Sequence, residues 1–92
     1  MAPQTKKSDI RIVILQRGWT MVGRFAQKGS QCTLTNASVI RRWGTTRGLG
    51  EITAAGPTPK TVLDPVGEVS FHELTVIATL ACESDKWAPH CA

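Results

Sequence analysis

The chain has 92 residues and a formal net charge of +4, and this length corresponds to a single domain. No apolar run approaches the roughly 20 residues of a membrane-spanning helix, and the first residues lack the apolar stretch of a secretory signal. The three cysteines are an odd number and too sparse for the disulfide framework of a small secreted protein. We therefore expect a soluble, cytoplasmic protein.

The charge is distributed unevenly along the chain. Residues 1–47 carry nine Lys and Arg against one Asp, whereas residues 48–92 carry two Lys against six acidic residues. Such asymmetry favours one basic face for an anionic partner, or two oppositely charged faces that attract each other between subunits. If the two halves instead interleave in the fold, their charges neutralise locally.

Six runs of the sequence have the length and the β-branched content of strands. They are residues 10–15, 19–26, 31–35, 39–43, 66–71 and 75–82. The first two runs predict a hairpin that turns near residues 16–18. Gly23 predicts a bulge inside the second run, and Asn36 marks the place of another. No run has the pattern of an amphipathic helix.

The sequence divides into an arm, a domain and a tail. Residues 1–8 are polar and predict a disordered basic arm, residues 9–82 predict a single β domain, and residues 83–92 predict a polar tail. Within the domain, residues 44–65 contain four glycines and three prolines, and only residues 49–55 could form a short element there. A long irregular connection in a compact domain is more often functional than idle.

These elements predict an all-β fold. We expect a small antiparallel barrel of five or six strands, SH3-like or Sm-like, in preference to a β-sandwich. A short chain buries a small fraction of its surface, and the edges of its sheet must be closed or paired with another chain. We therefore expect a homo-oligomer.

The most distinctive stretch is residues 38–50, Ser-Val-Ile-Arg-Arg-Trp-Gly-Thr-Thr-Arg-Gly-Leu-Gly. Amides in a glycine-punctuated turn can surround an anion, arginine forks match pairs of phosphate oxygens, and a tryptophan face can stack on a base. Residues 56–65 form a second loop, in which proline restricts the backbone and lowers the entropy cost of ordering. The candidate ligand-binding residues are Arg41, Arg42, Trp43, Gly44, Thr45, Thr46, Arg47, Thr58, Lys60 and Asp64.

Two of these residues have an alternative interpretation. Trp43 could belong to the core, because tryptophan is usually highly buried. Asp64 could accept a hydrogen bond from a ligand, although pairing with Arg41 or Arg47 is the preferred interpretation, since a buried acid needs a partner.

The sequence contains no constellation typical of catalysis or of metal binding. His72 and His90 are part of no nucleophile–histidine–acid pattern, and there is no P-loop or dinucleotide-binding motif. Cys32 and Cys82 are interpreted as buried, inert thiols, and Cys82 with His90 and Cys91 matches no common zinc spacing. We therefore expect a protein that is not an enzyme and that holds no metal and no cofactor.

The run Ser-Val-Ile-Arg-Arg-Trp-Gly-Thr-Thr-Arg-Gly-Leu-Gly-Glu, with Gly-Pro-Thr and Thr-Val-Leu-Asp-Pro behind it, resembles a family of short uncharacterised proteins of tailed bacteriophages and prophages. The resemblance covers residues 36–66. It implies a phage origin and action in the host bacterial cytoplasm, and it transfers neither a ligand nor a mechanism.

Three functions follow as hypotheses. The first is a module that binds a nucleotide-type phosphorylated ligand, and so sequesters a signal of host defence. The second is a small barrel that binds nucleic acid through its basic half and an exposed tryptophan. The third is a protein–protein adaptor or virion component in which the oppositely charged halves pair between subunits.

Overall fold

The computed structural model describes residues 10–91, and these form five strands, two short α-helices and three 3₁₀ turns. The predicted arm at residues 1–8 lies outside the described residues. None of the helices within residues 10–91 is long and apolar enough to cross a membrane. In chain order the elements are β1 (Ile10–Leu15), η1 (Gln16–Gly18), β2 (Thr20–Lys28), β3 (Gln31–Arg42), α1 (Leu49–Ala55), β4 (Val62–His72), η2 (Glu73–Thr75), β5 (Val76–Ala81), α2 (Ser84–Trp87) and η3 (Ala88–His90).

The strands form one antiparallel sheet in the order β4-β3-β2-β1-β5. The predicted hairpin is confirmed, since β1 pairs with β2 across η1. The edge strands β4 and β5 do not pair with each other, so the sheet is not closed into a barrel. This corrects the prediction of a small SH3-like or Sm-like barrel, whereas the prediction of an antiparallel, mostly β fold is confirmed.

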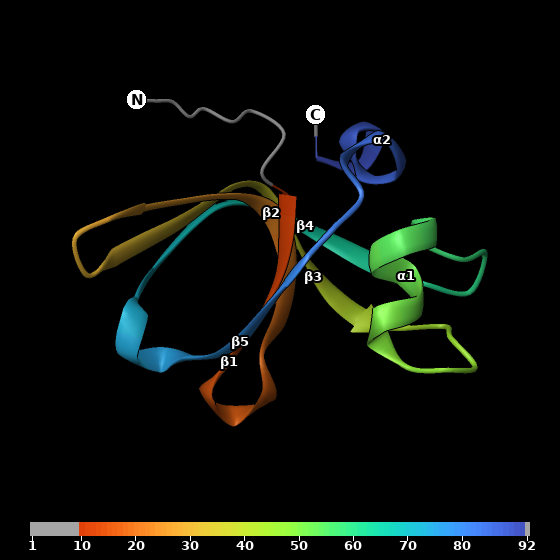
Figure 1. Cartoon of the computed structure of the whole chain (residues 1–92), viewed down its shortest axis with the longest axis horizontal. Coiled ribbons are helices and arrows are strands. Elements are labelled where there is room, and N and C mark those ends of the chain that lie inside the picture. Colours follow the sequence, from red (N-terminus) through yellow and green to blue (C-terminus); the bar gives the residue numbers. More distant parts are fainter. Residues whose placement is uncertain (1–9, 92) are drawn as a thin grey trace.

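The sheet is strongly curved. A flat sheet of five strands would separate its edges by roughly 19 Å, yet β4 and β5 are joined only by the three residues of η2. Such a link spans at most about 14 Å when fully extended. The two edges therefore approach each other at η2, and Figure 1 shows the curl that results.

Two bulges help to bend the sheet. The register between β2 and β3 shifts at Gly23, and a Cβ at this position would lie 3.0 Å from that of Ala37. The register between β3 and β4 shifts near Asn36, which has a positive φ of 51°. Both bulges were predicted, but the runs at residues 31–35 and 39–43 are one continuous strand across Asn36.

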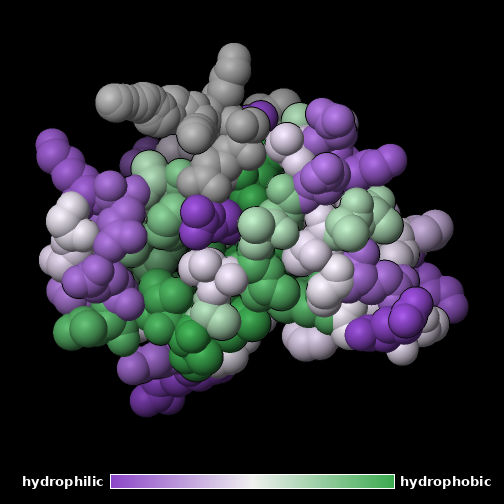
Figure 2. Space-filling view, viewed as in Figure 1, coloured by the Kyte–Doolittle hydropathy of each residue, from purple (hydrophilic) through white to green (hydrophobic). Residues whose placement is uncertain are grey.

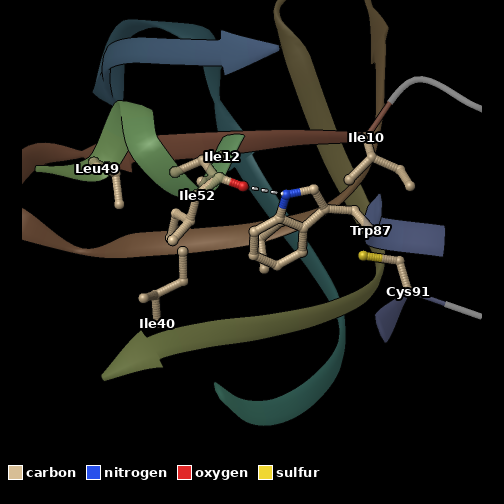
Figure 3. Close-up of a cluster of buried hydrophobic side chains, with 8 residues drawn as sticks. Ile10, Ile12, Ile40, Leu49, Ile52, Trp87 and Cys91 are labelled. Atoms are coloured by element: carbon tan, nitrogen blue, oxygen red, sulfur yellow. Dashed lines mark hydrogen bonds between the residues drawn. The ribbon is translucent and has the colours of Figure 1, made fainter. Parts of the chain in front are cut away.

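One face of the sheet is covered by the helices. Ile10 and Ile12 of β1 pack there with Leu49 and Ile52 of α1, and Trp87 of α2 lies at the centre of the cluster with none of its surface exposed (Figure 3). The indole Nε1 donates a hydrogen bond of 2.7 Å to the carbonyl of Ile52.

This packing differs from the expectation for residues 83–92, which were interpreted as a polar tail. Trp87 and Cys91 are both fully buried, and the Nε of Arg24 in β2 donates to the Cys91 carbonyl at 2.9 Å. The segment belongs to the domain because it covers apolar side chains that the sheet alone would leave exposed.

The other face is concave, and its apolar side chains are buried against one another because the sheet curls around them. Val13 and Leu15 of β1 pack there against Cys32 and Leu34 of β3 and Phe71 of β4. Alternate residues of β1 thus enter two different cores, so the strand is buried on both faces.

Candidate functional site

The two irregular loops that the sequence singled out are docked against each other. The hydroxyl of Thr61 donates to the Trp43 carbonyl at 2.6 Å, and that of Thr58 donates to the Gly44 carbonyl at 2.8 Å. The Thr58 amide also donates to the Thr61 hydroxyl at 2.8 Å. Thr58 therefore holds the loops together, and its hydroxyl is committed to the protein.

Gly44 allows this close approach. Its φ is +68°, which favours glycine, and a Cβ here would lie 2.5 Å from the Thr61 amide nitrogen. No other residue type fits without displacing the backbone of the opposite loop. The role of Gly44 is thus to let the chain turn against residues 60–61.

Asp64 pairs with Arg41. The Nε of Arg41 lies 2.7 Å from Oδ2 of Asp64, and this hydrogen bond raises the pKa of the guanidinium. The pair joins β3 to β4, where Val39 is opposite Asp64. Of the two partners considered for Asp64, Arg41 is the one in the structure, and Arg47 is not.

The amides of the 44–48 turn already hold an anion, the side chain of Glu51. Its Oε1 accepts from the amide nitrogens of Thr46 and Arg47 at 3.2 and 3.0 Å, and from the Thr46 hydroxyl at 3.4 Å. Glu51 lies in the first turn of α1, a usual place for an acid that satisfies amides preceding a helix. The turn that was expected to take a ligand phosphate is therefore occupied by the protein itself.

Four candidate residues remain available, and we call them the loop surface: Arg42, Trp43, Arg47 and Lys60. All four are exposed, and Trp43 has 43% of its surface accessible, which places it outside the core. Within residues 10–91 the side chains of Arg42, Arg47 and Lys60 make no hydrogen bond or ion pair. Arg42 and Trp43 extend from the end of β3, and Gly44 packs directly against the backbone of Lys60. Thr45 is half-buried beside them.

Burial disfavours the thiolate form of the three cysteines. Cys32 and Cys91 are buried and Cys82 is half-buried, and none forms a disulfide. Burial raises the pKa of all three thiols, that of Cys82 to about 12. Within residues 10–91 no three His, Cys, Asp or Glu side chains come together as metal ligands.

The structure also contains a hollow of about 270 Å³ that was not predicted from the sequence. It opens on the concave side of the sheet, and Arg11, Phe25, Gln27, Cys32 and Glu73 line much of it. One signal was present in the sequence: Arg11 alternates with Val13 and Leu15, so a charge shares the face of an apolar strand. A cation in that position indicates a polar site within a core.

No protein-family model matches the chain, and no curated protein is similar enough in sequence to be counted as a relative.

Proposed function

We propose that the loop surface binds single-stranded nucleic acid. The observation that carries this proposal is an exposed indole, that of Trp43, on a surface whose three cations make no ion pair within residues 10–91. Base–aromatic stacking contributes about 1–3 kcal/mol per base, and Arg42 adjoins Trp43 in the sequence while Lys60 lies opposite Gly44. The combination supports one stacked base and its two flanking phosphates.

The shape of the surface favours a strand over a free nucleotide. Sites for small molecules are concave and bury most of the ligand, whereas Arg42, Trp43, Arg47 and Lys60 are all exposed. An extended strand needs only a platform for stacking and charges that follow its backbone. Double-stranded nucleic acid keeps its bases stacked in the duplex. Its phosphates could contact the cations, but no base would be available to stack on the Trp43 indole.

Trp43→Ala tests the proposal against a matched control. Trp19 is also exposed, but it lies at the end of η1, so Trp19→Ala removes an exposed indole that is not one of the four residues of the loop surface. In fluorescence anisotropy with labelled 12-mers of dT and rU at low salt, we expect Trp43→Ala to weaken binding by about tenfold or more. Trp19→Ala should bind like the wild type.

Two results would contradict the proposal. One is the absence of binding to either oligonucleotide at low salt. The other is an equal effect of both tryptophan substitutions. The affinity of the wild type should also fall steeply as salt rises, because the phosphates release counterions when Arg42, Arg47 and Lys60 bind them.

A nucleotide-type ligand held between two copies of the chain is the second candidate. The outer edge of β4 pairs with no strand within residues 10–91, and β4 begins at Val62, beside Lys60 and opposite Arg42. A second copy docked on this edge would supply the wall that the open surface lacks. In a phage protein such a pocket would sequester a nucleotide signal of host defence. Thermal shift with mono-, di- and cyclic dinucleotides, together with the mass in solution, separates this candidate from the first.

A further inference from the structure

The outer edge of β5 is open. This strand pairs with β1 on one side, and within residues 10–91 it pairs with no strand on the other. Most of its residues are exposed, namely Ile77, Ala78, Thr79 and Ala81. An unpaired edge presents a row of N–H and C=O groups that can pair with a strand of another chain, unless the sequence prevents it.

The opposite edge of the sheet, that of β4, carries the features that usually prevent such pairing. Pro65 has no amide hydrogen, and Gly67 has a φ of +81° beside a shift of the register. Asp64 and Glu68 add charge to the same strand. Proline, irregular backbone and charged side chains are the means by which proteins protect exposed edges. The edge of β4 is therefore protected along its middle.

The strand β5 lacks these features over most of its length. Its sequence, Val-Ile-Ala-Thr-Leu-Ala, contains no charged residue, no proline and no glycine. Its one register shift lies at its first residues, and residues 78–81 pair regularly with β1. The Cys82 amide donates to the Ile10 carbonyl, and hydrogen bonds alternate in direction along an antiparallel strand. The amides of Thr79 and Ala81 therefore point away from β1, toward the open edge.

Large apolar side chains are exposed at the start of this edge. Ile77 has 64% of its surface accessible and Leu74 has 77%. The exposed Trp19 belongs to the same end of the sheet, because its carbonyl accepts from the Leu15 amide at 2.7 Å and Leu15 lies opposite Val76. Figure 2 shows hydrophobic residues gathered at the lower left, where Figure 1 places η2 and the start of β5. Exposed apolar patches typically mark contacts with a partner.

We propose that β5 pairs antiparallel with β5 of a second copy of the chain, about a two-fold axis at Thr79. A two-fold axis brings the same patch of both copies together, so the open row of donors and acceptors meets an identical row. This register places Ile77 opposite Ala81 of the partner subunit, and a large side chain thus meets a small one. The two five-stranded sheets continue into one another across the axis.

The difference between the two edges favours a second copy as the partner. An edge without charge has no means of selecting a foreign strand by electrostatic complementarity, whereas it matches itself. Pairing of β5 with β4 of a neighbour would repeat without closing, and Pro65 and Gly67 interrupt that edge. Pairing of β5 with β5 closes at two copies, and it gives a short chain more buried surface. The loop surface takes no part in this contact.

The mass of the whole chain in solution tests the proposal. In sedimentation equilibrium at submillimolar concentration, we expect the wild type to have twice the mass of the chain. Ile77→Lys places a charge on the edge at an exposed position, so the variant should fold, and circular dichroism checks this. It should raise the dissociation constant of the dimer by about tenfold or more. Val66→Lys is the matched control, because Val66 is 47% exposed and lies on β4, and this variant should remain a dimer.

Thr79→Cys locates the axis. Residues directly opposite each other in an antiparallel pair have Cα atoms about 5.5 Å apart or less, within the range of a disulfide. Oxidised glutathione should therefore join two copies of this variant, and should join neither the wild type nor Val66→Cys.

Three results would overturn the proposal. The first is a single-chain mass for the wild type, which would leave the edge to a strand of another protein. The second is the formation of open-ended aggregates in place of a dimer. The third is a dimer that Val66→Lys disperses and Ile77→Lys does not, which would assign the contact to β4. None of these measurements involves an oligonucleotide, so they decide the β5 contact separately from the function of the loop surface.

Discussion

At the scale of single residues, the threonines and Gly44 of the two loops make contacts within the protein, and these contacts leave them little capacity to bind a ligand. Residues that are well suited to phosphate are equally well suited to joining loops, because both tasks need small donors near the backbone. The hydroxyls of Thr58 and Thr61 donate to backbone carbonyls. The long side chains of Arg42, Arg47 and Lys60 are exposed and make no ion pair within residues 10–91.

Gly44→Ala tests how much the close approach of the loops matters. The substitution adds a methyl group where φ is +68° and the backbone of residues 60–61 blocks it. Gly29→Ala is the matched control, because φ there is +63° and nothing lies within 4 Å of the added Cβ. We expect Gly29→Ala to lower the free energy of unfolding by about 1–2 kcal/mol, and Gly44→Ala to lower it by clearly more in urea denaturation. An equal decrease in the free energy of unfolding for both variants would show that the contact between the two loops does not contribute to stability.

At the scale of elements, the strands were predictable and the helices were not. The alternation of β1 determines the two faces of that strand, and Gly23 correctly marked the bulge in β2, because period and turn chemistry are local properties. Residues 49–55 were expected to form a short element, and this stretch is α1. The helix has only seven residues and contains a glycine, so its pattern is too short to show that the element is helical. Trp87 was the only large apolar side chain among residues 83–92, and its burial depends on distant residues of the sheet.

For the site, sequence reasoning identified the two loops, but could not assign the hydrogen-bond and ion-pair partners of their residues. The choice of Arg41 for Asp64 follows from the register of β3 and β4, which no local pattern reveals. The capture of the 46–47 amides by Glu51 depends on where α1 starts. The hollow required the curl of the whole sheet, which brings Glu73 beside Gln27 although 46 residues separate them.

Glu51→Gln tests the connection between α1 and the loop. A neutral acceptor forms weaker hydrogen bonds to the amides of Thr46 and Arg47 than a carboxylate does, so the free energy of unfolding should fall by about 1 kcal/mol. At the same time the loop loses a negative charge, and oligonucleotide binding should become tighter than in the wild type. Anisotropy at low salt measures this, with Glu68→Gln as the control for the change in net charge. If the two variants bind equally well, Glu51 does not oppose the ligand.

At the scale of the whole molecule, two cores share one sheet. The face under α1 and α2 is sealed by Trp87, whereas the concave face is covered only by its own curvature. The C-terminal segment is thus as much a part of the core as β1. Hydrogen bonds attach this segment both to the sheet, through Arg24 of β2, and to α1, through Ile52. Loss of the segment would therefore destabilise both elements.

Alkaline pH should loosen this attachment. Burial raises the pKa of the Cys82 thiol from 9.0 to about 12, and the neighbouring Cys91 adds to the shift. In the unfolded chain the thiol loses its proton near pH 9, while the folded chain retains it, so folding stability falls as pH rises between these values. Cys82→Ala removes the group, and its free energy of unfolding should decline less steeply than that of the wild type from pH 9 to pH 11. Parallel declines in urea denaturation would contradict the assignment.

The position of β5 has a consequence for how the protein is made. Ala81 lies opposite Arg11, and the Cys82 amide donates to the Ile10 carbonyl. One of the two strands that pair with β1 therefore comes from near the end of the described residues. Contacts between such distant residues form slowly, because the loop between them must close first. While β5 is still being synthesised, β1 therefore lacks one of its two neighbouring strands, and the helix-side face of the sheet is not yet covered by Trp87. The complete core can form only after synthesis has passed Trp87, and until then the nascent chain exposes apolar side chains that the finished domain buries.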